Sequence, residues 1–283
     1  AAGCSAFDLY RDPAEIPSAD RWFPEGACRA VSAMLQRPGR IRTDAWLIVN
    51  KGDDPEEKVA PWVRRRGYRC FKLKIMGRDN AADVARTVEV YRAVRAFGAK
   101  DVRLTVDSNE ANPDAASVLD YLERLRDADS EAFDALAYVE QPTGRDIREH
   151  RHDWRAVTRL KPVMLDEGLT SLDLMPEARA QGWSGFALKT CKGHGFALVA
   201  AAWALQRGMP LTLQDLTNPG LAAIHALLFA AHVPTLNGAE LNSPQFTPAA
   251  NDDWMPRLRG LFDPRNGEQV IEGPVPNGLG STL

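Results

Sequence analysis

Ionisable side chains recur along this chain at the ends of short apolar runs. They are Lys72, Lys74, Asp107, Glu140, Asp166, Glu167, Lys189, Asp215 and Glu240. Most of these runs are separated by about 25 to 35 residues, as expected for strands joined by crossover helices. In such a fold the carboxyl ends of the strands meet on one face, so these charges would converge on one pocket. A charge buried there is costly unless it is paired or bound to a metal ion.

Three of these residues have the chemistry of metal ligands. Asp107, Glu140 and Asp166 end three successive apolar runs. Three oxygen ligands from separate strands would leave open positions on an octahedral Mg²⁺ for water or substrate. Carboxylates without histidine or cysteine beside them favour Mg²⁺ or Mn²⁺ over zinc. The alternative is that each acid is a helix N-cap or a surface charge.

The lysines could act as acids and bases. Phe71-Lys72-Leu73-Lys74-Ile75 alternates, so both lysines point to one face of a strand. A solvated edge strand would show the same alternation. Lys189 ends Phe186-Ala187-Leu188-Lys189 and would lie roughly across a barrel from Lys74. Two other roles are open for Lys189: a structural ion pair with Glu167, or the nucleophile of a Schiff-base aldolase.

The elements that would position these residues are those of an α/β barrel. Short β-branched or aromatic runs alternate with stretches that have helical apolar spacing, which is typical of a parallel sheet with crossover helices. The expected strands are Ala45–Asn50, Cys70–Ile75, Val102–Asp107, Ala137–Glu140, Val163–Asp166, Phe186–Lys189, Leu211–Gln214 and Ala239–Leu241. They predict a TIM-like (β/α)7β barrel over residues 43–250. Residues 1–42 are expected to be irregular, and residues 251–283 to form a C-terminal tail that packs back on the barrel.

Composition narrows the classes of partner. The chain has 283 residues, 45% of them hydrophobic and 26% charged, and a net charge of -3. This balance gives no basic field for nucleic acid or an anionic membrane, and no apolar run reaches the roughly 20 residues that span a bilayer. A small molecule is therefore the expected partner. The four cysteines have neither zinc-site spacing nor the density of a disulfide-rich domain, so we expect reduced thiols and a cytoplasmic protein.

Five short motifs carry a resemblance to a known family. They are Lys72-Leu73-Lys74, Val106-Asp107-Ser108-Asn109, Val139-Glu140-Gln141-Pro142, Leu165-Asp166-Glu167 and Leu188-Lys189. In this order they resemble the signature of the enolase superfamily and, within it, the muconate lactonizing enzyme and mandelate racemase group. The resemblance covers about residues 43 to 283, including Gly278-Leu279-Gly280.

The resemblance implies specific roles for these residues. Asp107, Glu140 and Asp166 would bind Mg²⁺, while Lys74 and Lys189 would be acid/base catalysts on opposite faces of a small carboxylate substrate. Lys72 would help to neutralise the substrate carboxylate, and Asn109 and Glu167 would support the metal ligands. The implied reaction removes the proton next to a carboxylate through an enediolate, the strategy of enolase-superfamily sites. Racemisation or epimerisation, cycloisomerisation and dehydration are all compatible with it.

The branch of the family and the completeness of the pocket are less defined. A lysine on both sides resembles the muconate lactonizing, o-succinylbenzoate synthase and dipeptide epimerase branch, but Gly238-Ala239-Glu240-Leu241-Asn242 lacks the Asp-x-Asp of dipeptide epimerases. Residues 1–42 are too short for the capping domain of about a hundred residues that the family places before its barrel. We expect them to be a remnant of, or linker from, such a region. A barrel that keeps a metal site but is weakly active or inactive is the alternative, and assembly into a homo-oligomer is open.

Overall fold

The computed structural model describes residues 3–11, 17–36, 38, 41–272 and 277–280. The chain forms two compact units. Unit 1 comprises Ala1–Ala45, Leu188–Pro264 and Glu268–Leu283, and unit 2 comprises Trp46–Ala187 and Arg265–Gly267. Parts of the expected N-terminal segment (1–2, 12–16, 37 and 39–40) and of the expected tail (273–276 and 281–283) lie outside the described residues. The boundaries expected at residues 43 and 250 stay predictions.

Unit 2 is built on parallel strands that follow one another in sequence order. They are β2 (Trp46–Val49), β3 (Cys70–Lys74), β4 (Arg103–Asp107), β5 (Leu136–Glu140), β6 (Val163–Leu165) and β7 (Gly185–Leu188). Each pairs with the next in parallel register. Sequential parallel strands with crossover connections are the pattern of a TIM-like barrel. The predicted α/β, TIM-like class is thereby confirmed.

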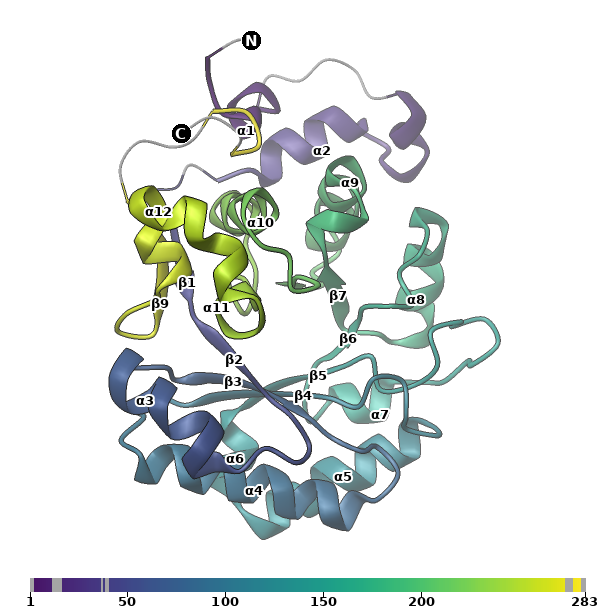
Figure 1. Cartoon of the computed structure of the whole chain (residues 1–283). Coiled ribbons are helices and arrows are strands. Elements are labelled where there is room, and N and C mark those ends of the chain that lie inside the picture. The colour runs from purple at the N-terminus through teal and green to yellow at the C-terminus, as the bar shows by residue number, and fades with distance from the viewer. Residues whose placement is uncertain (1–2, 12–16, 37, 39–40, 273–276, 281–283) are drawn as a thin grey trace. The chain divides into compact units, whose positions relative to one another are not determined.

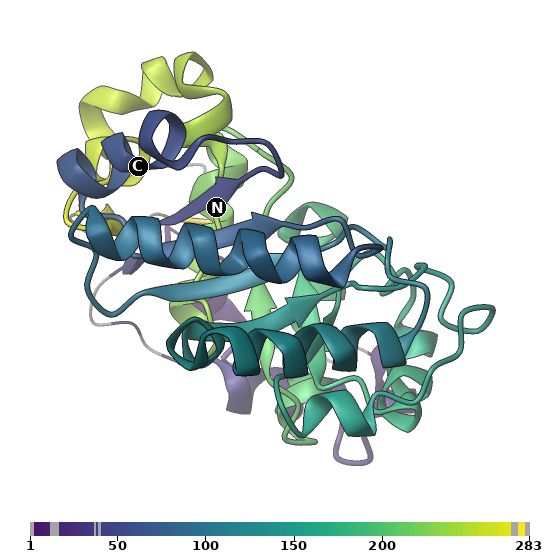
Figure 2. The ribbon, with the colours of Figure 1, turned by 90° about the horizontal axis from the view of Figure 1, so that it is seen from below.

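Helices connect these strands. They are η2 (Pro55–Val59), α3 (Ala60–Arg66), α4 (Asn80–Ala96), α5 (Ala115–Ala128), α6 (Ser130–Ala135), α7 (Arg155–Thr158), η3 (Leu172–Leu174) and α8 (Met175–Gln181). Aspartates cap several of them: Asp54 accepts from the Glu57 N–H at 2.9 Å and Asp114 from the Ser117 N–H at 2.8 Å. Figures 1 and 2 show α4 and α5 side by side along strands β2 to β5.

The interior of unit 2 is apolar below the strand ends. Tyr138 on β5, Met164 on β6 and Ala187 on β7 pack into one fully buried cluster. Side chains two residues apart on a strand share a face. Residues 140 and 166 therefore point to the same side as Tyr138 and Met164, one step nearer the carboxyl edge.

Unit 1 contains the other helices and three short strands. They are α1 (Ala6–Leu9), η1 (Pro17–Trp22), α2 (Ala27–Met34), β1 (Ile41–Asp44), η4 (Thr190–Lys192), α9 (His194–Leu205), β8 (Leu211–Leu213), α10 (Leu221–His232), α11 (Ser243–Phe246), η5 (Pro248–Trp254), α12 (Met255–Phe262) and β9 (Glu268–Ile271). Strand β9 pairs antiparallel with β1, placing Ile271 opposite Ile41.

The strand expected at Ala239–Leu241 is reduced to a single parallel bridge between Gln214 and Glu240. The side chain of Asn237 explains this. Its Oδ1 accepts from the Leu213 N–H at 3.0 Å and its Nδ2 donates to the Leu213 carbonyl at 2.9 Å. The amide thus takes the Leu213 N–H that a longer ladder would use, while the Leu213 carbonyl also accepts from the Glu240 N–H at 2.9 Å. Gly238 follows Asn237 with φ at +67°.

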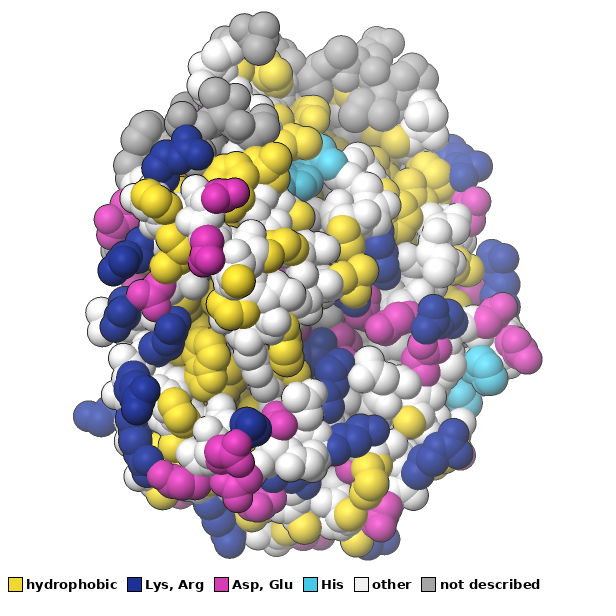
Figure 3. Space-filling view, viewed as in Figure 1, with side chains coloured by type: hydrophobic (Ala, Val, Ile, Leu, Met, Phe, Trp, Pro, Cys, Tyr) yellow, Lys and Arg dark blue, Asp and Glu magenta, His cyan; other side chains and the backbone are white. Residues whose placement is uncertain are grey.

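Two surface properties bear on partners. Among the described residues, no helix combines the length and apolar character needed to cross a bilayer. On the face shown in Figure 3, Lys and Arg are interspersed with Asp and Glu over unit 2 rather than gathered by sign.

Candidate active site

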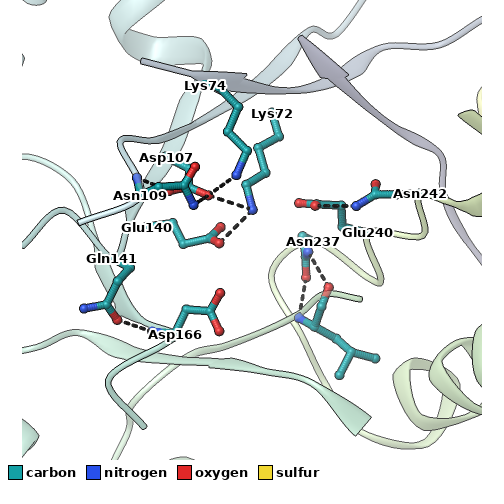
Figure 4. Close-up of polar contacts among 11 residues, drawn as sticks. Lys72, Lys74, Asp107, Asn109, Glu140, Gln141, Asp166, Asn237, Glu240 and Asn242 are labelled. Carbon is teal, nitrogen blue, oxygen red and sulfur yellow. Dashed lines mark hydrogen bonds and ion pairs between the residues drawn. The ribbon is translucent and has the colours of Figure 1, made fainter. Parts of the chain in front are cut away.

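Two lysines of β3 reach the carboxyl edge of the unit 2 strands. Lys72 and Lys74 alternate with the buried residues Phe71 and Leu73. The Lys72 ammonium lies 2.7 Å from Glu140 Oε1 and 3.2 Å from Asp107 Oδ2, and is almost completely buried. The Lys74 ammonium lies 2.6 Å from Asp107 Oδ2 and is partly exposed. Figure 4 shows both ammonium groups directed at these carboxylates.

The strand register explains why the acids gather. Lys74 is paired with Asp107, Asp107 with Glu140, and Glu140 with Met164, two residues before Asp166. All three carboxylate residues are buried, and Figure 4 shows the carboxylates of Glu140 and Asp166 pointing to the same side. They sit at the ends of β4 and β5 and just after β6.

The charges at this edge fix the ionisation of Asp107. Burial alone would raise the pKa of Asp107. Four interactions outweigh burial and lower that pKa to about 2. They are the positive charges of Lys72 and Lys74, the hydrogen bond from Lys74, and the hydrogen bond from the Asn109 N–H. Asp107 is therefore a carboxylate at neutral pH.

The carboxylates at this edge fit a metal ion in type. Within the described ranges, no three His, Cys, Asp or Glu side chains are arranged as a ready metal site. Instead, the Lys72 ammonium lies against two of the expected ligands and supplies a positive charge there. The donors themselves, three buried carboxylates, have the chemistry that Mg²⁺ prefers. Asp107, Glu140 and Asp166 are therefore suitable ligands by their chemistry.

Asn109 and Glu167 flank the acids. The Asn109 N–H donates to Asp107 Oδ1 at 2.7 Å from a residue with φ at +48°, so the turn after β4 holds that carboxylate. Glu167 directly follows Asp166 and is half-buried. Glu167 and Asp166 both contribute to the raised pKa of Arg145, after the larger effect of Glu110.

Gln141 is a positioning residue that the strand-end reasoning missed. Its Oε1 accepts from the Asp166 N–H at 2.9 Å and the Gly168 N–H at 3.0 Å, while its Nε2 donates to the Thr143 carbonyl at 2.9 Å. One buried amide thus connects the loop after β5 to the segment that carries Asp166. The sequence feature that could have indicated this role is an amide residue placed between a strand-end glutamate and a proline.

A recess of about 460 Å³ lies in the loops that follow β5 and β6. It is lined by Arg145, Asp146, Arg148, Thr170, Ser171, Asp173 and Leu174. Two arginines and two aspartates line it, and Arg145 is already paired with Glu110. The recess therefore has no strong preference for one sign of charge.

Lys189 belongs to unit 1 and has its own neighbours there. It follows β7, and the Leu188 carbonyl accepts from the Gln214 N–H at 2.9 Å. Gln214 bridges to Glu240. Lys189 and Asp215 therefore follow adjacent strand ends, and Glu240 lies in the segment bridged to the second of them. All three are buried. The position expected for Lys189 across from Lys74 stays a prediction.

Comparisons with known proteins agree with this fold. Residues 54–283 match the family model described as enolase C-terminal domain-like. The chain is 31% identical over 254 residues to the N-succinylamino acid racemase of Thermus thermophilus, covering 86% of this chain and 60% of that protein. It is also 31% identical over 218 residues to muconate cycloisomerase 1-2 of Acinetobacter lwoffii, covering 73% and 52%.

Among solved structures, the muconate lactonizing enzyme from Pseudomonas fluorescens complexed with muconolactone superposes with a TM-score of 0.64 at 24% identity. That match covers 91% of this chain and 67% of the other. Compared with the racemase and the cycloisomerase named above, the chain spans 60% or less of their length. Since the family model matches most of the chain and the parallel strands have the same architecture, this chain belongs to the enolase C-terminal domain-like family.

Proposed function

We propose that this chain removes, with Mg²⁺, a proton from the carbon next to the carboxylate of a small-molecule substrate. The observation that carries the proposal is the ion-paired group at the edge of unit 2. There Lys74 and Lys72 lie within 3.2 Å of Asp107, and Lys72 within 2.7 Å of Glu140. Basic groups and the proposed metal ligands are thus joined at the strand ends where such barrels react.

Each residue has a role in the proposed reaction. Asp107, Glu140 and Asp166 would hold the metal ion, which when bound stabilises negative charge on the substrate carboxylate. Lys72 adds a second positive charge near that position. Lys74, when neutral, accepts the α-proton from one face, and Lys189 accepts or returns a proton on the other. Return of the proton to the opposite face gives racemisation or epimerisation.

The relatives support this class of reaction. One is named a racemase of N-succinylamino acids and another a muconate cycloisomerase, and both names refer to carboxylate compounds. We extend to this chain only the shared part, a small carboxylate and an isomerase-type or lyase-type reaction. Nucleic acid and membrane are not proposed partners, consistent with the mixed charges of Figure 3. A cytoplasmic location is part of the proposal, because the cysteines have neither zinc-site spacing nor the density of a disulfide-rich domain.

Hydrogen exchange in D₂O tests the proposal. The protein is incubated with Mg²⁺ and the separate enantiomers of N-acylamino acids, and α-deuterium is followed by NMR. Lys74→Ala should reduce exchange from one enantiomer by about 10² to 10⁴-fold while sparing the other, and Lys189→Ala should show the reverse pattern. Lys192→Ala, at an exposed lysine three residues from Lys189, serves as the matched control.

The outcomes of this experiment separate the mechanisms. Loss of exchange in the presence of a chelator supports the metal requirement. Loss in only one lysine variant indicates a one-base elimination in which the other lysine acts electrostatically. Unchanged exchange in both variants, or no exchange in the wild type with any acid, contradicts the proposal.

A further inference from the structure

A second buried charge cluster lies in unit 1, beside Lys189. The carboxylate of Asp215 follows β8 and is fixed by two backbone donors. Its Oδ1 accepts from the Thr217 N–H at 2.8 Å and its Oδ2 from the Asn242 N–H at 3.1 Å. Thr217 has φ at +61°, so the turn after β8 is shaped around this carboxylate. Asp215 is only 6% exposed.

Asn242 connects Asp215 to a second carboxylate. While its backbone N–H binds Asp215, its side-chain Nδ2 donates to Glu240 Oε1 at 3.2 Å, as Figure 4 shows. Glu240 is 1% exposed. One asparagine therefore holds two buried carboxylates close together, an arrangement that favours a cation nearby or a proton on one of them.

Lys189 is a cation of unit 1 that acts on Asp215. The Gln214 N–H donates to the Leu188 carbonyl. The next residue on each strand, Asp215 and Lys189, therefore lies at adjacent strand ends. The pKa of Asp215 is raised to about 6, mainly by burial and also by Glu240. The Thr217 and Asn242 N–H groups and Lys189 act in the opposite direction and lower this pKa. Since such coupling is reciprocal, the Asp215 carboxylate stabilises the ammonium form of Lys189.

We propose that Asp215 is a positioning residue that sets the protonation state of Lys189. Asp215 does not touch the substrate in this role. Its ionised form holds Lys189 as the ammonium acid, and its protonated form releases Lys189 toward the neutral amine. The charged groups of unit 1 that act on Asp215 are Glu240 and Lys189. The inference rests on the acid/base role proposed above for Lys189.

The kinetic test uses the pH profile of exchange on each face. In Asp215→Asn, Lys189 loses a stabilising negative charge, so its pKa falls. The acidic limb of exchange on the Lys189 face should move down by about one pH unit, a tenfold gain in exchange below the wild-type midpoint. Exchange on the Lys74 face should keep its midpoint. Asp215→Glu, which retains the charge, should restore the wild-type profile. Unchanged midpoints on both faces in Asp215→Asn would overturn the inference.

A second measurement needs no catalysis. The side-chain carboxyl of Asp215 is titrated by ¹³C NMR, with its resonance assigned by its absence in Asp215→Asn. Lys189→Met should raise the pKa of Asp215 by about one unit, whereas Lys192→Met should not change it. An unchanged pKa in Lys189→Met overturns the inference even if exchange occurs. If the wild type exchanges nothing, the proposed function fails, and this titration alone decides whether Asp215 and Lys189 are coupled.

Discussion

The buried ammonium of Lys72 offers a quantitative test of the charge balance at the unit 2 strand ends. Lys72 and Lys74 face Asp107 and Glu140, so the four groups balance two positive with two negative charges. Lys72→Met keeps the length of the side chain and removes one positive charge. Glu140 then loses its contact with Lys72, while the ion pair of Lys74 with Asp107 remains. Breaking a buried pair by removing one partner costs about 3 to 5 kcal/mol, and that is the expected loss in the free energy of unfolding at pH 7.

Urea unfolding with a chelator present measures this loss. The matched control is Lys58→Met, because Lys58 lies 2.7 Å from Glu57, the same separation as Lys72 from Glu140, but both partners are exposed. Water screens an exposed ion pair, so Lys58→Met should change the free energy of unfolding only slightly. Lys72→Arg, which retains the charge, should lose less stability than Lys72→Met.

Mg²⁺ and pH give two further readouts of the same variant. Saturating Mg²⁺, at about 100 times its dissociation constant, should add roughly 2.7 kcal/mol to the stability of Lys72→Met. Without Lys72 the carboxylates at this edge repel one another, and protonation relieves part of that repulsion. The loss should therefore shrink as the pH falls toward about 4, near the ordinary pKa of a glutamate side chain. A loss below about 1 kcal/mol at pH 7, the usual upper range for an exposed pair, or one equal to that of Lys58→Met, would refute the assigned charge balance.

Two other substitutions test local structure. Gln141→Leu removes the acceptor of the Asp166 and Gly168 N–H groups. Two buried donors without partners should lower the free energy of unfolding in urea by about 2 to 4 kcal/mol. A loss no larger than that of Gln206→Leu, at an exposed glutamine, would contradict the positioning role of Gln141. In unit 1, burial and then His225 lower the pKa of His194 to about 4, and its Nδ1 lies 2.7 Å from His225 Nε2. A histidine held neutral in the folded state loses stability as pH falls from its unfolded pKa of about 6.5 toward 4. The melting temperature of His194→Gln should therefore fall less than that of the wild type between about pH 7 and 4.5, and equal falls would show that His194 does not contribute.

Strands with strong local signals were predictable from the sequence. The run Cys70–Ile75 became β3 (Cys70–Lys74), because alternation and a following loop define both ends. The pairing of β1 with β9 was not predictable, since it joins residues from opposite ends of the chain and neither strand is a distinctive apolar run. The expected strand at Ala239–Leu241 was wrong because a side chain, that of Asn237, competes for the backbone of Leu213.

The site was predictable in its residue types but not in its detailed contacts. Strand order alone places Asp107 and Glu140 together, so their proximity follows from the topology. The sequence could not show that Lys72 lies between them, since that depends on side-chain conformation and on which cation is nearest. Gln141 and Asn242 were missed for another reason. The Gln141 side chain accepts from loop backbone N–H groups, and Asn242 donates to the carboxylates of Asp215 and Glu240. No periodic pattern marks such positions.

The two lysines proposed as catalysts have partners of different character. A two-base reaction needs one lysine neutral while the other carries a proton, so two identical environments would be a disadvantage. Lys74 lies against Asp107, a carboxylate that two lysines keep ionised. Lys189 is coupled to Asp215, whose pKa of about 6 lets it gain a proton close to neutral pH. Near neutral pH the charge of Asp107, beside Lys74, is thus constant, while the charge of Asp215, beside Lys189, can vary. The protonation of Lys189 can therefore change without altering the charge of the carboxylate that contacts Lys74.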